Sequence, residues 1–179
     1  TVSDMAKVLI AYSTVDGHTL GICERIAEIV GWEGGEVTLA AIDEGEANNL
    51  GDYDKIVIGA SIRYGKHRPQ VVDLINANQE ILESRPSAFF SVNVVARKPE
   101  KNTPETNPYL QKFLKQISWK PQYMAVFAGK IDYPSYDFWD RTAIRFIMWM
   151  TKGPTDPTAV VEFTDWTKVD EFGRRVAEL

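Results

Sequence analysis

The sequence predicts an α/β fold in which a doubly wound, five-stranded parallel sheet carries helices on both faces. Short, nearly continuous apolar runs recur along the chain, helical patterns separate them, and neither an internal repeat nor a linker divides the chain. Strands that are apolar on both faces are typical of parallel sheets, because helices cover both faces of such sheets. The alternation of strand and helix implies right-handed crossovers and a single domain over residues 5–179.

The five predicted strands are Lys7 to Tyr12, Val37 to Ala41, Lys55 to Ala60, Ala88 to Val94 and Met124 to Gly129. The intervening residues show helical spacing or helix-start signals, such as a proline in the first turn, and predict helices over Thr19 to Val30, Pro69 to Leu82, Pro104 to Ile117 and Asp165 to Leu179. Ala159 to Thr164 is interpreted as the continuation of the fifth strand. The fifth strand is therefore expected to carry a long insertion, residues 130–158.

Length and composition limit the classes of protein that the chain can be. It has 179 residues, a net charge of −5, a single cysteine (Cys23) and two histidines. A disulfide framework is excluded, no metal site is expected, and the acidic balance argues against nucleic-acid binding. The four residues before Met5 are interpreted as a cloning remnant, and Thr1 to Lys7 show no secretory signal.

The loop after the first predicted strand has the composition of a phosphate-binding loop. Ser13 to Thr19 read Ser-Thr-Val-Asp-Gly-His-Thr and lead directly into a helix. Hydroxyl groups, a glycine and the free amides of a helix N-terminus together bind an anion without a lysine. The Walker and dinucleotide-binding motifs are absent from the sequence, so neither ATP nor a dinucleotide is favoured. The alternative is a hydroxyl-rich helix cap.

Two further loops are expected at the same edge of the sheet. Gly59 to Arg68 contains two glycines on either side of Tyr64, which suits a loop that lies against a flat ring, or else a plain surface turn. This loop and Arg97 to Lys101 hold one acid, Glu100, and six basic residues: Arg63, Lys66, Arg68, Arg97, Lys98 and Lys101. Such a concentration of positive charge predicts an acid-binding rim, although solvated loop residues are the alternative.

Three segments together resemble a known family. STVDGHT, GASIRYG and SVNVVARKPEKNTPETNPY are similar to the flavodoxin-like, menaquinone-dependent protoporphyrinogen IX dehydrogenases of bacterial haem biosynthesis, and the resemblance runs from Met5 to Leu179. It implies a flavodoxin-like fold and bound FMN, held by the loops after strands one, three, four and five. The implied FMN-binding residues are Ser13, Thr14, Val15, Asp16, Gly17, His18, Thr19, Ser61, Ile62, Arg63, Tyr64, Gly65, Ser91, Val92, Asn93 and the region after Gly129.

The resemblance also implies a reaction. Protoporphyrinogen IX would lose six hydrogens in three rounds of flavin reduction, and the electrons would pass to menaquinone or another respiratory quinone such as ubiquinone. Its propionates would meet Arg63, Arg97 and Lys98, since a guanidinium binds a carboxylate with two parallel hydrogen bonds. No catalytic residue is assigned. His67 is a weak candidate for proton transfer, and an exposed loop histidine is the favoured interpretation.

The insertion contains the most hydrophobic segment of the chain. A helix over Phe138 to Met150 would be apolar around most of its circumference, with Arg141 and Arg145 on one face. The segment is too short to span a membrane, but it suits a peripheral contact with the cytoplasmic face of the inner membrane. The residues proposed for membrane or quinone contact are Trp139, Arg141, Arg145, Phe146 and Trp149. Burial against the sheet edge, or a homo-oligomer interface, is the alternative.

Two other functions fit the same fold. A flavodoxin-type electron carrier would dock protein partners through acidic surface, which the basic rim opposes. An NAD(P)H:quinone reductase would be reduced by a nicotinamide cofactor. A phosphoacceptor signalling domain is excluded, because strands one and three end in Ala-Tyr-Ser and Gly-Ala-Ser rather than in acidic residues.

Overall fold

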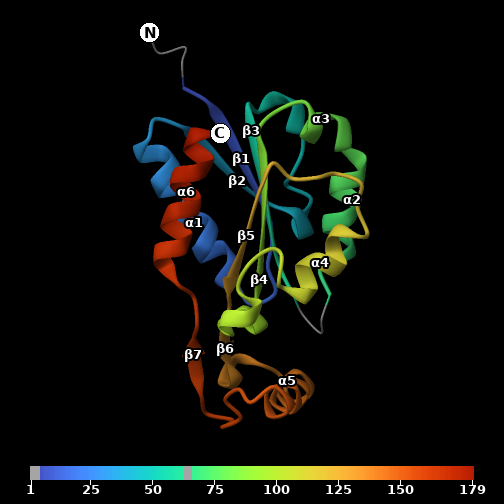
Figure 1. Cartoon of the computed structure of the whole chain (residues 1–179), viewed down its shortest axis with the longest axis vertical. Coiled ribbons are helices and arrows are strands. Elements are labelled where there is room, and N and C mark those ends of the chain that lie inside the picture. Colours follow the sequence, from blue (N-terminus) through green and yellow to red (C-terminus); the bar gives the residue numbers. More distant parts are fainter. Residues whose placement is uncertain (1–4, 63–65) are drawn as a thin grey trace.

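A computed structural model describes residues 5–62 and 66–179, and it contains the predicted parallel sheet. Five strands lie in the order β2-β1-β3-β4-β5, and all neighbours are parallel (Figure 1). This is the doubly wound order in which ligands bind at the carboxyl ends of the strands. The strands are β1 (Lys7–Ser13), β2 (Glu36–Ala41), β3 (Lys55–Ser61), β4 (Ser87–Asn93) and β5 (Tyr123–Ala128). The predicted fold class is confirmed.

Apolar residues on both sides of each inner strand explain why the sheet is covered on both faces. All seven residues of β4 are buried. Successive residues of β1 point into opposite cores, because Leu9 joins one hydrophobic cluster and Ile10 the other. The parallel register then aligns the two sets, with Leu9 opposite Ile56 and Ile10 opposite Val57.

Helices cover the two faces of the sheet (Figure 1). On one face, α1 (His18–Trp32) and α6 (Trp166–Glu178) bury apolar stripes that include Ile26 and Phe172. On the other face lie α2 (Pro69–Ala77), α3 (Gln79–Glu83) and α4 (Pro108–Leu114), which contribute Ile75 and Phe113 among others. The short 3-10 turns are η2 (Ile42–Glu44), η3 (Leu50–Asp52), η4 (Val94–Arg97), η5 (Pro99–Lys101) and η6 (Tyr133–Ser135).

Two helix predictions need correction. The helix expected over Pro69 to Leu82 is broken at Asn78, whose backbone leaves the helical region (φ −123°) while its side-chain amide donates to the Leu74 carbonyl at 2.9 Å. The helix expected over Pro104 to Ile117 begins only at Pro108. It begins there because the Asn107 side chain accepts the Leu110 N–H at 3.1 Å and caps the first turn.

The continuation predicted for the fifth strand is also wrong. Beyond Gly129 the chain leaves the main sheet as β6 (Lys130–Asp132), and β7 (Val160–Glu162) pairs with β6 in an antiparallel, two-stranded ribbon. Since β5 ends the main sheet, residues past its end find no parallel neighbour and pair with the returning chain instead. The ribbon carries α5 (Phe138–Met150), which lies beyond the carboxyl ends of the strands (Figure 1). Within the described residues, no helix is long and apolar enough to cross a membrane.

The C-terminal end of α5 forms a Schellman motif that has a lysine where glycine is usual. The Gly153 N–H donates to the Met148 carbonyl at 2.7 Å, and Lys152 between them has a left-handed backbone with φ 61°. A residue with a Cβ is destabilised by about 1–2 kcal/mol of steric strain in this conformation. Glycine avoids the strain but costs about 0.5–1 kcal/mol, because its unfolded state has more conformational entropy to lose.

We therefore expect Lys152→Gly to stabilise the protein by about 0.5–1 kcal/mol, because glycine removes the larger of these two costs. Urea unfolding would measure the gain. Lys152→Ala is the matched control, since it removes the charge and keeps the strain. An equal gain in both variants would show that charge, not backbone strain, is responsible.

Candidate functional site

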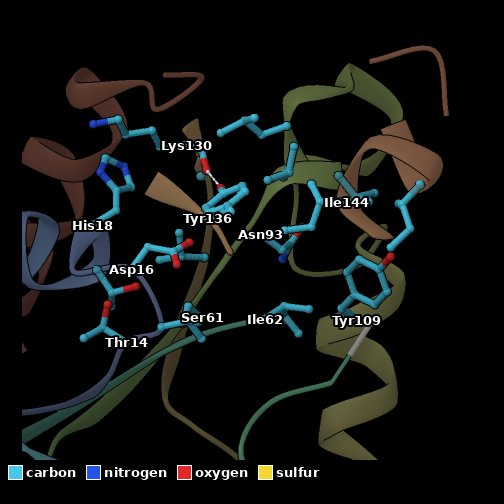
Figure 2. A pocket seen from close by; sticks show the side chains of 18 of the residues that line it. Thr14, Asp16, His18, Ser61, Ile62, Asn93, Tyr109, Lys130, Tyr136 and Ile144 are labelled. Atoms are coloured by element: carbon cyan, nitrogen blue, oxygen red, sulfur yellow. Dashed lines mark hydrogen bonds between the residues drawn. The ribbon is translucent and has the colours of Figure 1, made fainter. Parts of the chain in front are cut away.

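A pocket of about 790 Å³, including its open mouth, lies at the carboxyl ends of the strands (Figure 2). Three strand-end loops and the insertion enclose it. The lining residues are Thr14, Val15, Asp16, His18, Thr19, Ser61, Ile62, Val92, Asn93, Val94, Val95, Tyr109, Gly129, Lys130, Ile131, Tyr136, Ile144, Ile147 and Met148.

Most of the residues predicted to bind the cofactor lie together in this pocket. Those that line it are Thr14, Val15, Asp16, His18, Thr19, Ser61, Ile62, Val92 and Asn93. The predicted residues Arg63, Tyr64 and Gly65 lie outside the described part of the chain. Ser13, Gly17 and Ser91 are described but do not line this pocket.

The polar end of the pocket is the loop that enters α1. Gly17 has a left-handed backbone (φ 81°), which places the turn immediately before the first helical residue. The Gly17 N–H donates to the Thr14 hydroxyl oxygen at 2.9 Å, so the hydroxyl proton of Thr14 is still available to a ligand. The first turn of α1 has unpaired amides and no side-chain cap, and both features favour an anion at this end.

Ser13 supports the loop from behind and does not face the pocket, which corrects its predicted role. Its buried hydroxyl bonds to the Asp43 carboxylate at 2.9 and 3.2 Å from the two oxygens. Arg68, at the start of α2, pairs with the same carboxylate at 3.1 Å. Asp43 thus joins the loop after β1 to the segment that follows β3.

His18 is the first residue of α1 and is bonded to the returning insertion. Its Nε2 lies 2.7 Å from the Thr164 hydroxyl, and that hydroxyl donates its one proton to the Ala128 carbonyl at 2.6 Å. Nε2 must therefore be the donor to Thr164. Burial lowers the pKa of His18, the nearby Lys130 lowers it further, and Glu162 at 3.9 Å opposes the shift, as does Asp16.

A buried polar network stands behind the end of β4. The Asn93 side chain accepts the Ala96 N–H at 3.1 Å and exchanges amide hydrogen bonds with Asn107, which fixes η4 against the start of α4. Ser91 belongs to this network, since the Asn93 side-chain amide donates to its hydroxyl oxygen at 3.2 Å, and His67 Nε2 lies 3.0 Å from the same hydroxyl. Ser91 therefore shapes the pocket without lining it.

His67 is not the exposed loop histidine that the sequence suggested. Its ring packs against Phe113 at 4.5 Å and Phe89 at 5.9 Å between ring centroids, and it does not line the pocket. Burial lowers the pKa of His67 to about 4, so the ring is neutral at pH 7. The contact between a loop residue and the α4 face is long-range, and local sequence gave no signal for it.

Part of the basic rim is used inside the protein. Arg68 pairs with Asp43, as described above. Arg97 donates from Nη1 to the Val94 carbonyl at 3.0 Å and from Nη2 to the Thr151 carbonyl at 3.0 Å. These bonds and its absence from the lining do not support Arg97 as a residue that clamps substrate propionates. Lys98 follows it in the chain and is partly exposed.

The apolar wall of the pocket comes from α5, for which the sequence predicted membrane or quinone contact, with burial against the sheet edge or an oligomer interface as the alternative. Ile144, Ile147 and Met148 face the pocket (Figure 2, where Ile144 is labelled). The opposite face is exposed and aromatic, with Trp139 78%, Phe146 56% and Trp149 70% accessible. Spacings of three and four residues could have identified the inner face, but the aromatic residues around the helix obscured it.

Tyr109 and Lys130 complete the pocket; Tyr109 was not among the predicted site residues, whereas Lys130 belongs to the region after Gly129 that the resemblance implied. Tyr109 comes from α4, and Lys130 from β6 lies beside His18 (Figure 2). The contribution of Tyr109 depends on how α4 packs, which a linear motif does not encode. In the described ranges 5–62 and 66–179, no three His, Cys, Asp or Glu residues gather as a metal site.

Comparisons with known proteins agree with this geometry. A flavodoxin-domain family model matches residues 9–158. A Leishmania major protein named protoporphyrinogen IX dehydrogenase (quinone) is 45% identical over 179 residues, covering 99% of this chain and 77% of that protein. An Escherichia coli K12 protein of the same name is 43% identical, covering 97% of this chain and 96% of that protein.

Solved structures show the same fold at low identity. Oxidised flavodoxin 1 from Bacillus cereus superposes with a TM-score of 0.57 at 17% identity and covers 97% of this chain and 98% of its own. Two-electron reduced Megasphaera elsdenii flavodoxin gives a TM-score of 0.56 at 13% identity, covering 96% of this chain and 99% of its own. At such identities the likeness concerns the fold alone.

The neutral, buried state of His67 predicts an acid-dependent loss of stability. Its pKa is about 4 in the folded protein and about 6.5 unfolded, so between these values the unfolded state binds more protons. The free energy of unfolding should therefore fall as the pH drops from 7 to 4, by up to about 3 kcal/mol from this residue.

His67→Gln can keep the bond to Ser91 and cannot titrate, so its unfolding free energy should depend less on pH over this interval. Urea unfolding at pH 4.5 and pH 7 would measure the difference. Parallel pH profiles of the two proteins would contradict the assignment.

Proposed function

The chain belongs to the protoporphyrinogen IX dehydrogenase (quinone) family of flavodoxin-domain proteins, and we propose that it oxidises protoporphyrinogen IX to protoporphyrin IX with FMN as cofactor and a respiratory quinone as electron acceptor. This reaction makes it an oxidoreductase of haem biosynthesis. One observation supports the proposal above the others: a single pocket joins an anion-binding loop to an apolar wall supplied by the insertion.

The two ends of the pocket fit the two ends of FMN. The phosphate would be held by the Thr14 hydroxyl, the Thr19 side chain and the amides of the first turn of α1. Ser61, Ile62, Val92 and Asn93, at the ends of the two central strands, would lie along the flavin. FMN supplies two-electron redox chemistry when bound, so removing six hydrogens takes three rounds.

The protein's own residues bind and orient the reactants. Ile144, Ile147 and Met148 exclude water from one side of the pocket and offer a surface to the apolar face of a tetrapyrrole or a quinone ring. No described side chain is assigned a proton-transfer step. For the propionates we propose Lys98 and, outside the described residues, Arg63.

We further propose that α5 brings the pocket to the cytoplasmic surface of the inner membrane, where menaquinone or ubiquinone is dissolved. Its exposed face carries Phe138, Trp139, Phe146, Trp149 and Met150. Arg141 and Arg145 flank this face, and Lys152 follows the helix. Apolar aromatic residues with basic neighbours suit the interface of an anionic bilayer. Because the inner face of the same helix lines the pocket, a quinone would remain one helix diameter, about 10 Å, from the lipid surface.

Anaerobic turnover tests the function directly. The FMN-loaded protein is mixed with protoporphyrinogen IX, with and without a menaquinone analogue, and flavin absorbance and porphyrin fluorescence are followed. We expect bleaching by the porphyrinogen and quinone-dependent porphyrin fluorescence above the spontaneous rate. Flavin that resists the porphyrinogen but is bleached by NADPH would favour a quinone reductase, and reduction only by a partner protein would favour an electron carrier.

The hydrogen bonds of His18 predict that FMN affinity depends on pH. Its Nε2 proton is given to Thr164, so its other nitrogen can donate to a phosphate only when the ring is protonated. Burial lowers the pKa of His18 in the free protein, and a bound anion favours the charged ring. Affinity should therefore rise by about tenfold as the pH falls from 8 to 6.

Flavin fluorescence quenching would measure this affinity. His18→Gln controls for the titration of the FMN phosphate itself, and riboflavin controls for the rest of the flavin. If the variant and the wild type gave the same slope against pH, His18 would have no part in phosphate binding.

The membrane proposal predicts the effect of charge on the outer face of α5. The double variant Phe146→Glu with Trp149→Glu should retain FMN but lose at least about tenfold in affinity for anionic vesicles, since two exposed aromatic residues no longer enter the interface. Turnover with vesicle-bound quinone should fall in parallel.

Co-sedimentation with phosphatidylglycerol vesicles would measure this binding. Trp32→Glu is the matched control, because Trp32 is 70% exposed at the end of α1 remote from α5 (Figure 1). Equal binding by the double variant, the control and the wild type would contradict the proposal.

A further inference from the structure

Arg97 connects two segments that together form the apolar side of the pocket. It belongs to η4, directly after β4, and Val94 and Val95 of that turn line the pocket. Its Nη1 donates to the Val94 carbonyl at 3.0 Å within the same turn. Its Nη2 reaches the residue after α5, where it donates to the Thr151 carbonyl at 3.0 Å and contacts the Thr151 hydroxyl oxygen at 3.2 Å.

The surroundings of the guanidinium hold it in this position. The Arg97 guanidinium carbon lies over the Phe163 ring, 5.9 Å from the centroid of that ring. Burial lowers the pKa of Arg97. A Cβ on Gly153 would come within 3.0 Å of Nη2 and 2.5 Å of the Met148 sulfur. The guanidinium and Met148, one of the three α5 residues that line the pocket, therefore both pack close to Gly153.

The carbonyls that end α5 are the ones a helix cannot satisfy by itself. They carry the negative end of the helix dipole, so a cation is stabilised there. The arginine fork reaches Val94 and Thr151 from two separate nitrogens, Nη1 and Nη2, whereas a lysine would offer all of its donors from one nitrogen. The main sheet supplies no backbone ladder between η4 and α5, so this side chain is a direct bond between them.

We propose that Arg97 is a positioning residue that fixes the inner face of α5, and with it the apolar wall of the pocket, relative to the loop after β4. The consequence for the reaction rests on the proposed function. If the wall that contacts the tetrapyrrole is loosened, substrate should bind more weakly whether or not its propionates are charged.

Three variants of the FMN-loaded protein test this inference. Arg97→Gln removes the fork, Arg97→Lys keeps the charge, and Lys101→Gln removes a charge from the same basic loop without touching α5. Amide hydrogen exchange is measured over residues 144–155, and KM and kcat are measured with protoporphyrinogen IX and with its dimethyl ester.

We expect both Arg97 variants to exchange faster at the end of α5 and to raise KM by about tenfold for acid and ester alike, with a smaller change in kcat; about tenfold corresponds to one charge-assisted hydrogen bond. Lys101→Gln should exchange like the wild type. Unchanged exchange in Arg97→Gln, rescue by Arg97→Lys, or a KM effect confined to the diacid would overturn the proposal, and the last result would restore Arg97 as a propionate ligand.

The exchange measurement also separates this inference from the proposed function, because it needs no turnover. A protein that never oxidises the porphyrinogen would refute the function and still report on the bond. Should Arg97→Gln fail to fold, Arg97→Lys still tests the bond by itself: it should accelerate exchange at the same amides, and exchange equal to that of the wild type would count against the proposal.

Discussion

Every functional feature of this protein depends on the fact that five parallel strands end at one edge of the sheet. Loops from β1, β3 and β4 must meet there, and the backbone groups that they expose have no ladder to satisfy them. The edge strand β5 adds the further constraint. Past Gly129 it has no neighbour in the main sheet, so the chain pairs with itself as β6 and β7 and carries α5 across the open edge. The pocket is a consequence of this arrangement.

Helix α5 is unusual because both of its long faces are apolar. A helix that is only structural would bury one face and solvate the other, and its exposed tryptophans would cost solubility. Here Ile144 and Ile147 are used for the pocket, while Trp139 and Trp149 remain in solvent. Because both faces belong to one rigid helix, the distance between the pocket wall and the exposed aromatic face is fixed. One helix of thirteen residues can therefore line the pocket with one face while its other face is free for the proposed lipid contact.

The sequence was sufficient for features that depend on local pattern, and insufficient for those that depend on packing. Continuous apolar runs located all five strands of the main sheet to within one residue at each end, and the hydroxyls beside Gly17 identified a loop that lines the pocket. The sequence did not predict where a side chain points when its hydrogen-bond or packing partner is distant in the chain. Ser13 turns to Asp43, His67 turns to Phe113, and Arg97 turns to Thr151, and each partner lies at least thirty residues away in the chain. A motif contains residue types only, so it does not show that a distant hydrogen-bond acceptor or aromatic ring competes with the ligand for the same side chain.

The side chains whose direction the sequence did not predict have one physical role in common: each links two segments at the edge of the sheet. Loops at a sheet edge lack ladder hydrogen bonds, so long or polar side chains must hold them, and each bond to a charged group is worth more than a neutral one. Asp43 joins the loops of β1 and β3, Asn93 joins η4 to α4, and Arg97 joins η4 to α5. Of the charged residues predicted to bind the substrate, Arg97 instead holds the loop after β4 against α5. In a preorganised pocket, less of the binding energy is lost in ordering loops. A larger share of that energy therefore holds the flavin and its substrate in reacting geometry.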